Sequence, residues 1–210
     1  MGSTIGNEWN LTVDDACRNR LLTSAQAAYE NACTLVVDAK VLRNVERFHR
    51  AGALAILAEE EFAKGFMLAI CANIRRWDSA VFHDMNNHGA KQAVSQGVLA
   101  YMQWLKERFG DESGEIVLPI EPRHALIPDS VEFDKMVNHA RTMNIKKRTR
   151  DKLKQRLLYI GVGREACVVH RPSAIPVAVA DECIQTACEF KFAVEAVIAG
   201  QVVNFKTIAV

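Results

Sequence analysis

Residues 51–76 read AGALAILAEEEFAKGFMLAICANIRR. The apolar residues of this stretch recur at helical spacings, which predicts an α-helix with one wide buried face. The same helix carries three consecutive carboxylates, Glu59, Glu60 and Glu61, followed by Lys64. Three adjacent positions spread over roughly 200° of a helix, so at least one of these carboxylates must lie at a helix interface. A buried carboxylate needs a partner and therefore belongs either to a structural ion pair or to a functional site.

The composition is that of a globular protein without a strong charge bias. Half of the 210 residues are hydrophobic, which is enough for a sizeable core in a single domain. The 26 basic and 25 acidic side chains nearly cancel, so overall charge gives no argument for a nucleic-acid or membrane partner. The six cysteines contain no CxxC pair, and the first residues lack a secretion signal. We therefore expect free thiols, a cytoplasmic location and no membrane partner.

Helical periodicity extends over most of the chain. We expect a first helix over residues 11–43, a second from about 45 to 76, and a third from about 79 to 109 with Gly89 and Gly97 as weak points. Residues 110–130 hold two glycines and three of the five prolines, which predicts a loop. We expect a basic fourth helix from residue 129 or 130 to about 159, an irregular or briefly extended segment over 160–176, and a fifth helix over 177–200.

The last apolar stretch, residues 175–203, is long enough to raise the question of a membrane. Charged residues interrupt it every few positions, so we interpret it as a core helix. The strand signals are too few for a real sheet. The sequence therefore predicts one all-α domain over residues 1–210, a bundle of four to five mostly antiparallel helices with a long loop insertion and a short irregular segment before the last helix.

Residues 31–66 read NACTLVVDAKVLRNVERFHRAGALAILAEEEFAKGF. They resemble the signature of the AbiV-type abortive infection proteins, a pattern of Asn-Ala, Leu-x-x-x-Ala, Arg-Ala, Leu-Ala-Ile-Leu-Ala, Glu-Glu and Lys. The similarity includes a later His-x-x-Lys, residues 88–91, and the Leu-Leu-Tyr ending at Tyr159, and it covers most of residues 31–176. The residues that fill the pattern are Asn31, Ala32, Leu35, Ala39, Arg50, Ala51, Leu54, Ala55, Ile56, Leu57, Glu60, Glu61 and Lys64.

This resemblance implies a HEPN-like helical bundle, and many HEPN proteins are dimeric, metal-independent ribonucleases of phage-defence or toxin systems. Their catalytic signature is an arginine followed, after four to six residues, by a histidine. Arg76 and His83 match it with six residues between them. Arg43 and His49 match it with five.

RNA cleavage without a metal needs a base for the 2′-hydroxyl, an acid for the leaving oxygen and cations around the phosphate. His83 or His88 is the candidate for proton transfer. Arg76 and Lys91 are the candidate phosphate-binding cations, and Glu61 is the candidate that positions them. The two histidines are five positions apart, roughly 140° around a helix, so one pocket can use both only if the helix is distorted or two chains contribute. A homodimer meets that condition, and we expect one.

Two other charged groups each have a structural and a functional interpretation. Glu60 and Lys64 predict a structural ion pair that holds adjacent helices, which we favour over a catalytic role. Residues 141–156 contain eight cations and one acid, Asp151. Such a run could follow an RNA backbone, but it is also typical of a solvated helix face. Its RNA-binding candidates are Lys146, Lys147, Arg148, Arg150 and Lys154.

Two Glu-x-x-His pairs raise the question of a helical di-metal site. Glu46 to His49 is the first pair, and Glu121 to His124 is the second. The second pair contains Pro122 and lies in the expected loop, which argues against a helical ligand set. We therefore expect neither a metal nor any other cofactor.

Two functions remain open at the level of the sequence. The first, which the resemblance implies, is an abortive infection protein that acts as a ribonuclease toxin on cellular or phage RNA. The second is a non-catalytic helical dimer that binds a phage protein or a component of the translation machinery and so arrests growth or translation. In the second function, the buried carboxylates are purely structural.

Overall fold

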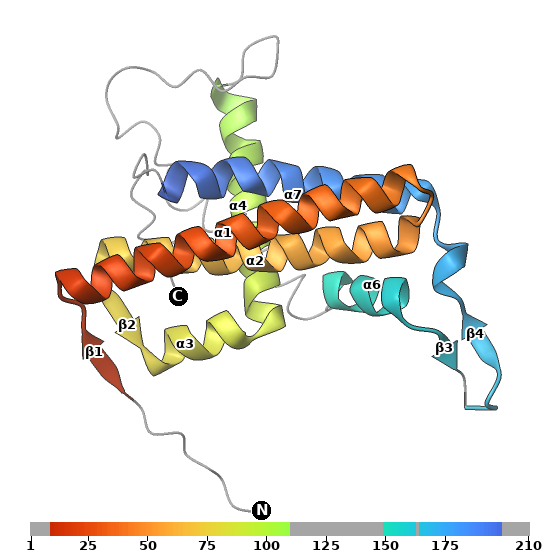
Figure 1. Cartoon of the computed structure of the whole chain (residues 1–210), viewed down its shortest axis with the longest axis horizontal. Coiled ribbons are helices and arrows are strands. Elements are labelled where there is room, and N and C mark those ends of the chain that lie inside the picture. The colour runs from red at the N-terminus through yellow and green to blue at the C-terminus, as the bar shows by residue number, and fades with distance from the viewer. Residues whose placement is uncertain (1–8, 110–148, 163, 199–210) are drawn as a thin grey trace, which may run out of the picture.

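Helices dominate the architecture (Figure 1). The computed structural model describes residues 9–109, 149–162 and 164–198, so the expected loop at 110–130 and most of the expected fourth helix lie outside the described residues. This architecture confirms the predicted all-α bundle. The α-helices are α1 (Asp15–Asn44), α2 (Phe48–Ile74), α3 (Ser79–Asn86), α4 (His88–Phe109), α6 (Thr149–Leu158) and α7 (Val177–Ile198). The short elements are the strands β1 (Asn10–Thr12), β2 (Arg76–Asp78), β3 (Gly161–Val162) and β4 (Val168–His170), and the 3-10 helix η2 (Pro172–Ala174).

The two longest helices begin and end where local chemistry allows. Asp14 caps α1, because its side chain accepts a hydrogen bond from the backbone N–H of Cys17 at 2.7 Å. Glu46, with φ 59°, adopts the left-handed conformation in the turn that separates α1 from α2. Arg75, with φ 53°, ends α2 in the same conformation. Both helices therefore lie within a few residues of their predicted ranges.

α2 is the central helix of the bundle. It packs against α1, α4, α6 and α7. Figure 1 shows α1, α2 and α7 aligned with one another while α4 crosses them. Small residues let α1 and α2 approach closely, since a Cβ added at Gly65 would lie 3.1 Å from the backbone oxygen of Ala25. A helix with neighbours on so many sides has little room for solvated carboxylates, and two of its glutamates are buried.

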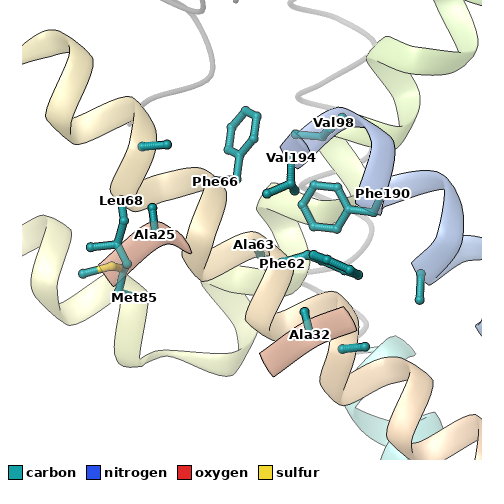
Figure 2. Packing of buried hydrophobic residues seen from close by; sticks show 14 of the residues in the cluster. Ala25, Ala32, Phe62, Ala63, Phe66, Leu68, Met85, Val98, Phe190 and Val194 are labelled. Atoms are coloured by element: carbon teal, nitrogen blue, oxygen red, sulfur yellow. The ribbon is translucent and has the colours of Figure 1, made fainter. Parts of the chain in front are cut away.

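Aromatic side chains fill the space between α1, α2 and α7. The ring centroids of Phe62 and Phe66 on α2 lie 6.2 and 6.4 Å from that of Phe190 on α7. Tyr29 of α1 lies 5.7 Å from Phe62. Figure 2 shows Phe62, Phe190 and Val194 close together in this core. The expectation of a core helix over the last apolar stretch is confirmed, and in the described ranges no helix is both long and apolar enough to cross a membrane.

The expected third helix is wrong in one respect, because it consists of two helices. α3 ends at Asn86 and α4 begins at His88, with Asn87 between them in an extended conformation. The side-chain oxygen of Asn87 accepts hydrogen bonds from the backbone N–H groups of Gly89 at 2.8 Å and Ala90 at 3.2 Å. Asn87 therefore caps α4, beside the expected weak point at Gly89. The break puts His88 in the first turn of a new helix.

Two small antiparallel sheets add to the bundle. β1 pairs with β2, with Leu11 opposite Trp77, and so ties the start of the described chain to the end of α2. The sequence did not predict this pairing. β3 pairs with β4, with Gly161 opposite His170, inside the segment 160–176 that was expected to be irregular or briefly extended. Trp77 of β2 is partly buried and packs against the core.

Candidate functional site

Glu59 and Glu60 are adjacent, and both are almost fully buried. Their exposed fractions are 1% and 2%. Consecutive helix positions point roughly 100° apart, so the two carboxylates meet different neighbours. Glu59 meets Arg150 of α6, whereas Glu60 meets Lys154 of α6 together with residues of α4. The expectation that at least one carboxylate of this row lies at a helix interface is confirmed.

Glu59 and Arg150 form a forked ion pair inside the bundle. Arg150 Nη2 lies 2.6 Å from Glu59 Oε1, and Arg150 Nε lies 3.3 Å from Oε2. Arg150 Nη1 also donates to the Sγ atom of Cys183 on α7 at 3.6 Å. Burial raises the pKa of Glu59 to about 7, against the charge and the hydrogen bonds of Arg150. Because the Arg150 side chain is only 11% exposed, this pair links α2, α6 and α7 rather than forming a site.

Glu60 accepts hydrogen bonds at both carboxylate oxygens. Lys154 Nζ and Gln92 Nε2 lie 2.6 and 2.9 Å from Oε1. His88 Nδ1 lies 2.5 Å from Oε2, and Lys91 Nζ lies 4.0 Å from the same oxygen. Burial alone would raise the pKa of this carboxyl, but the hydrogen bonds from Lys154, His88 and Gln92 lower it overall. Glu60 is therefore an ionised carboxylate held inside the protein, and we name it with these four neighbours the Glu60 cluster.

His88 is the part of the Glu60 cluster that reaches the surface. Its side chain is 59% exposed, whereas that of Glu60 is 3% exposed. An ionised carboxylate can only accept, so Nδ1 of His88 donates to Glu60, and in the neutral ring Nε2 is then the nitrogen that can take a proton. The same arrangement, a carboxylate that fixes the tautomer of an imidazole, orients histidines for proton transfer.

Lys91 lies one turn after His88 on the same face of α4. Burial lowers its pKa, although the nearby Glu60 opposes this effect. Its side chain is 8% exposed, and its Nζ atom lies at the long distance of 4.0 Å from Oε2 of Glu60. Lys91 is thus a cation at the inner edge of the cluster. Glu60 accepts a hydrogen bond from Lys154 but lies too far from Lys91 to accept one from it.

The expected ion pair between Glu60 and Lys64 is wrong. Lys64 Nζ lies 2.8 Å from Oε1 of Glu61, and Asn31 of α1 donates to Oε2 of Glu61 at 3.2 Å. Glu60 and Glu61 point to different sides of α2, so a lysine three positions after Glu61 reaches that carboxylate instead. Glu61 therefore bridges α1 and α2, and the structure does not bring it to His88. The glutamate that holds His88 is Glu60.

Residues 20–191 match the family model of AbiV, which is of the HEPN type. The chain belongs to the AbiV family. The matched range includes the whole Glu60 cluster, and it confirms the resemblance that residues 31–66 carry. Membership places the chain among the abortive infection proteins of phage defence. No curated protein and no solved structure matches it.

The first HEPN-type signature of this AbiV chain stays apart from the Glu60 cluster. Arg76 Nε lies 2.6 Å from Oδ2 of Asp78, two residues further along β2. His83 is exposed on α3. Of the catalytic candidates in the sequence, the described structure brings together His88 and Lys91, and it joins neither Arg76 nor His83 to them.

The second signature is also dispersed in the AbiV chain. Arg43 makes a two-pronged contact with Asp181 of α7, at 2.9 and 3.2 Å, and is therefore engaged between α1 and α7. His49 is half-buried at the start of α2, where burial lowers its pKa. Among the described residues, no group of three or more His, Cys, Asp or Glu could hold a metal ion. The pair Glu121 to His124 lies outside those residues.

The expected RNA-binding run of the AbiV chain divides into separate parts. Residues 146–148 lie outside the described residues. Arg150 and Lys154 point inward, and their charges are bound by the two buried glutamates. The spacing of Arg150, Lys154 and buried Leu157 is i, i+4, i+7, which is the pattern of a helix face turned to the core. This periodicity could have identified Lys154 as a partner of α2, but no signal in the sequence identified Gln92.

Proposed function

We propose that this protein acts in abortive infection by cleaving RNA without a metal, with His88 as the residue that moves the proton. One observation carries the proposal: a buried, ionised Glu60 holds the ring of a surface histidine at 2.5 Å. That contact fixes Nε2 of His88 as a base at the surface and stabilises the charged ring once it has taken a proton. His83 has no such carboxylate partner in the described structure, which favours His88 between the two candidates.

The proposed reaction uses two side chains of the cluster. Nε2 of His88 takes the proton of the RNA 2′-hydroxyl, and the 2′-oxygen attacks the adjacent phosphorus. The bond from phosphorus to the 5′-oxygen breaks, and that oxygen takes a proton from the ammonium of Lys91. The products are a 2′,3′-cyclic phosphate and a free 5′-hydroxyl. Before it gives up its proton, Lys91 also stabilises the negative charge on the phosphate. Its lowered pKa suits it to that donation.

The test is a cleavage assay in the presence of a chelator. Purified protein is incubated with total cellular RNA beside the variants His88→Ala and His83→Ala. Removing an acid or base at this step costs roughly 100- to 10,000-fold in rate, so His88→Ala should leave the RNA intact while His83→Ala cleaves it. RNA left intact by the unaltered protein would remove the nuclease proposal, and equal cleavage by His88→Ala would remove His88 as the residue that moves the proton.

A second candidate function is binding without catalysis, by a homodimer that engages a phage protein or a component of the translation machinery. The exposed valines of α1 support it. Val37 and Val41 of α1 and Val45, which caps the end of that helix, are 59%, 56% and 59% exposed and stand at spacings of four, so they form an apolar ridge. In this case His88→Ala would still arrest growth when overproduced, and no RNA would be cleaved. The growth assay and the cleavage assay together separate the two functions.

A further inference from the structure

α6 carries cations on two opposite faces. Arg150 and Lys154 point inward and are bound by glutamates. Lys152 and Arg156 stand two positions away from Lys154 on either side, roughly 200° around the helix, and both are exposed. Neither forms an ion pair with an acidic side chain of the described residues. The inner face thus explains part of the basic run, and the outer face is left without a structural role.

The outer face continues into the β3–β4 hairpin. The ring of His170, in β4, contacts the backbone oxygen of Arg156 at 2.5 Å and so holds the hairpin to the end of α6. Figure 1 shows this hairpin at the end of the bundle, beyond α6. Arg164 lies in the turn between the strands, Arg171 follows β4, and both are exposed. We name the exposed set Lys152, Arg156, Tyr159, Arg164 and Arg171 the arm surface.

The arm surface combines positive charge with an exposed aromatic ring. Tyr159 is 59% exposed, and Ile160 beside it is 56% exposed. Between residues 152 and 171 the only acid is Glu165. Exposed cations on neighbouring elements suit the phosphates of a nucleic acid, and an exposed ring offers a platform for an unpaired base. An aromatic platform has no use in duplex recognition, because bases in a duplex are already stacked.

From these observations we infer that the arm surface binds single-stranded RNA, with the four cations on phosphates and Tyr159 stacked on a base. The inference rests on the proposed function, because the RNA bound there is the proposed substrate of the Glu60 cluster. α6 connects the two, since Lys154 contacts Glu60 on its inner side and Lys152 and Arg156 face outward on the same helix.

The first experiment measures binding of a short fluorescent single-stranded RNA in the His88→Ala background, so that cleavage cannot remove the probe. The test variant carries Arg164→Gln and Arg171→Gln. The matched control carries Arg20→Gln and Lys40→Gln, two exposed cations of α1, and changes the net charge equally. Each lost phosphate contact should reduce the slope of log affinity against log salt by about 0.7 in the test variant. An unchanged slope and affinity in the test variant, or an equal effect in the control, overturns the inference.

The second experiment separates stacking from charge. Tyr159→Ala should weaken RNA binding roughly 5- to 150-fold, whereas Tyr159→Phe keeps the ring and should bind as the parent protein does. A poly-glutamate peptide serves as the probe for an acidic protein partner. If it binds the arm surface as tightly as the RNA and Tyr159→Ala has no effect, the surface belongs to an acidic protein and the inference is wrong. Binding that persists while the unaltered protein leaves RNA intact would refute the nuclease proposal alone.

Discussion

Lys154 and Glu60 form a buried ion pair, and replacing either residue alone should lower the stability of the protein. Both side chains are at most 5% exposed, and their charged atoms lie 2.6 Å apart. A buried pair of this kind contributes little net stability relative to apolar side chains, because both charges lose their hydration. Removing one partner alone lowers the stability, since the other charge then stays in the interior with fewer hydrogen bonds.

We therefore expect Lys154→Met to lower the free energy of unfolding by about 3 kcal/mol, as measured by urea denaturation. Lys152→Met is the matched control, because Lys152 lies on the same helix but is exposed, and it should change stability by less than about 0.5 kcal/mol. The double variant Glu60→Gln with Lys154→Met should recover part of the loss, since the buried carboxylate that Lys154 leaves behind is then neutral. Equal stability of the two single variants would contradict the buried pair.

Glu59 should give the protein a measurable pH dependence of stability. Its pKa in the folded state is raised to about 7 from 4.5, mainly by burial. Between these two values the folded state binds more protons than the unfolded state, so the free energy of unfolding falls as pH rises through this window. The component due to Glu59 is of the order of 3 kcal/mol. Glu60 acts with the opposite sign, because its pKa is lowered, and its contribution to stability is lost as the medium becomes acidic.

The measurement is the difference between the parent protein and Glu59→Gln, followed by urea denaturation from about pH 5 to pH 8. Relative to Glu59→Gln, the parent should lose stability as pH rises. Glu165→Gln, at an exposed acid of the hairpin, should run parallel to the parent and serves as the control. A difference that stays constant with pH would show that Glu59 is ionised throughout, as an ordinary ion pair with Arg150.

Residues of this site differ in how far the sequence could predict them. The row of three glutamates in an apolar helix predicted a buried carboxylate, because helix geometry leaves no other arrangement. It could not assign the partner, since Lys154 is 94 positions away from Glu60 and only tertiary packing brings it there. Lys64 was nearer in sequence but lies on the side of Glu61. His88 and Lys91 were candidates through the resemblance, and the structure adds Glu60 and Gln92 as the residues that hold the ring and its carboxylate.

At the scale of the elements, periodicity predicted the long helices well, because α1, α2 and α7 each bury a regular face. It failed where a single polar side chain decides the backbone. Asn87 breaks the expected third helix through two hydrogen bonds that no hydrophobic pattern reports. The pairing of β1 with β2 was missed for another reason, since the strands are three residues long and more than 60 positions apart.

Two glycines of α2 test how closely the helices pack. A Cβ at Gly65 would lie 3.1 Å from a backbone oxygen of α1, whereas a Cβ at Gly52 would lie 3.2 Å from the end of the Leu157 side chain. A side-chain end can move, but the backbone of α1 moves only with the whole helix. Alanine gains a similar helix propensity at both positions. Gly65→Ala should therefore be less stable than Gly52→Ala by about 1 kcal/mol or more in thermal unfolding. The opposite order would show that α1 shifts freely on α2.

For the molecule as a whole, the positions of His83 and His88 on two separate helices remove one reason to expect a dimer. On one continuous helix, His83 and His88 could share a pocket only through distortion or a second chain. α3 and α4 are separate helices, so that geometric requirement no longer applies. Support for a homodimer now comes from the exposed ridge of Val37, Val41 and Val45, an apolar strip that solvent covers in the monomer.

We expect this ridge to pair with its own copy, because an antiparallel, two-fold arrangement of two α1 helices about Val41 places Val37 opposite Val45. Light scattering should then give about twice the chain mass of 23.4 kDa. Val41→Lys puts a charge at the centre of the interface and should yield the monomer, while Val168→Lys, at the 47% exposed Val168 of the hairpin, should leave the dimer intact. A mass of 23.4 kDa for the unaltered protein at micromolar concentration excludes the dimer. A dimer that survives Val41→Lys places the interface elsewhere and leaves the valine ridge free for a different protein.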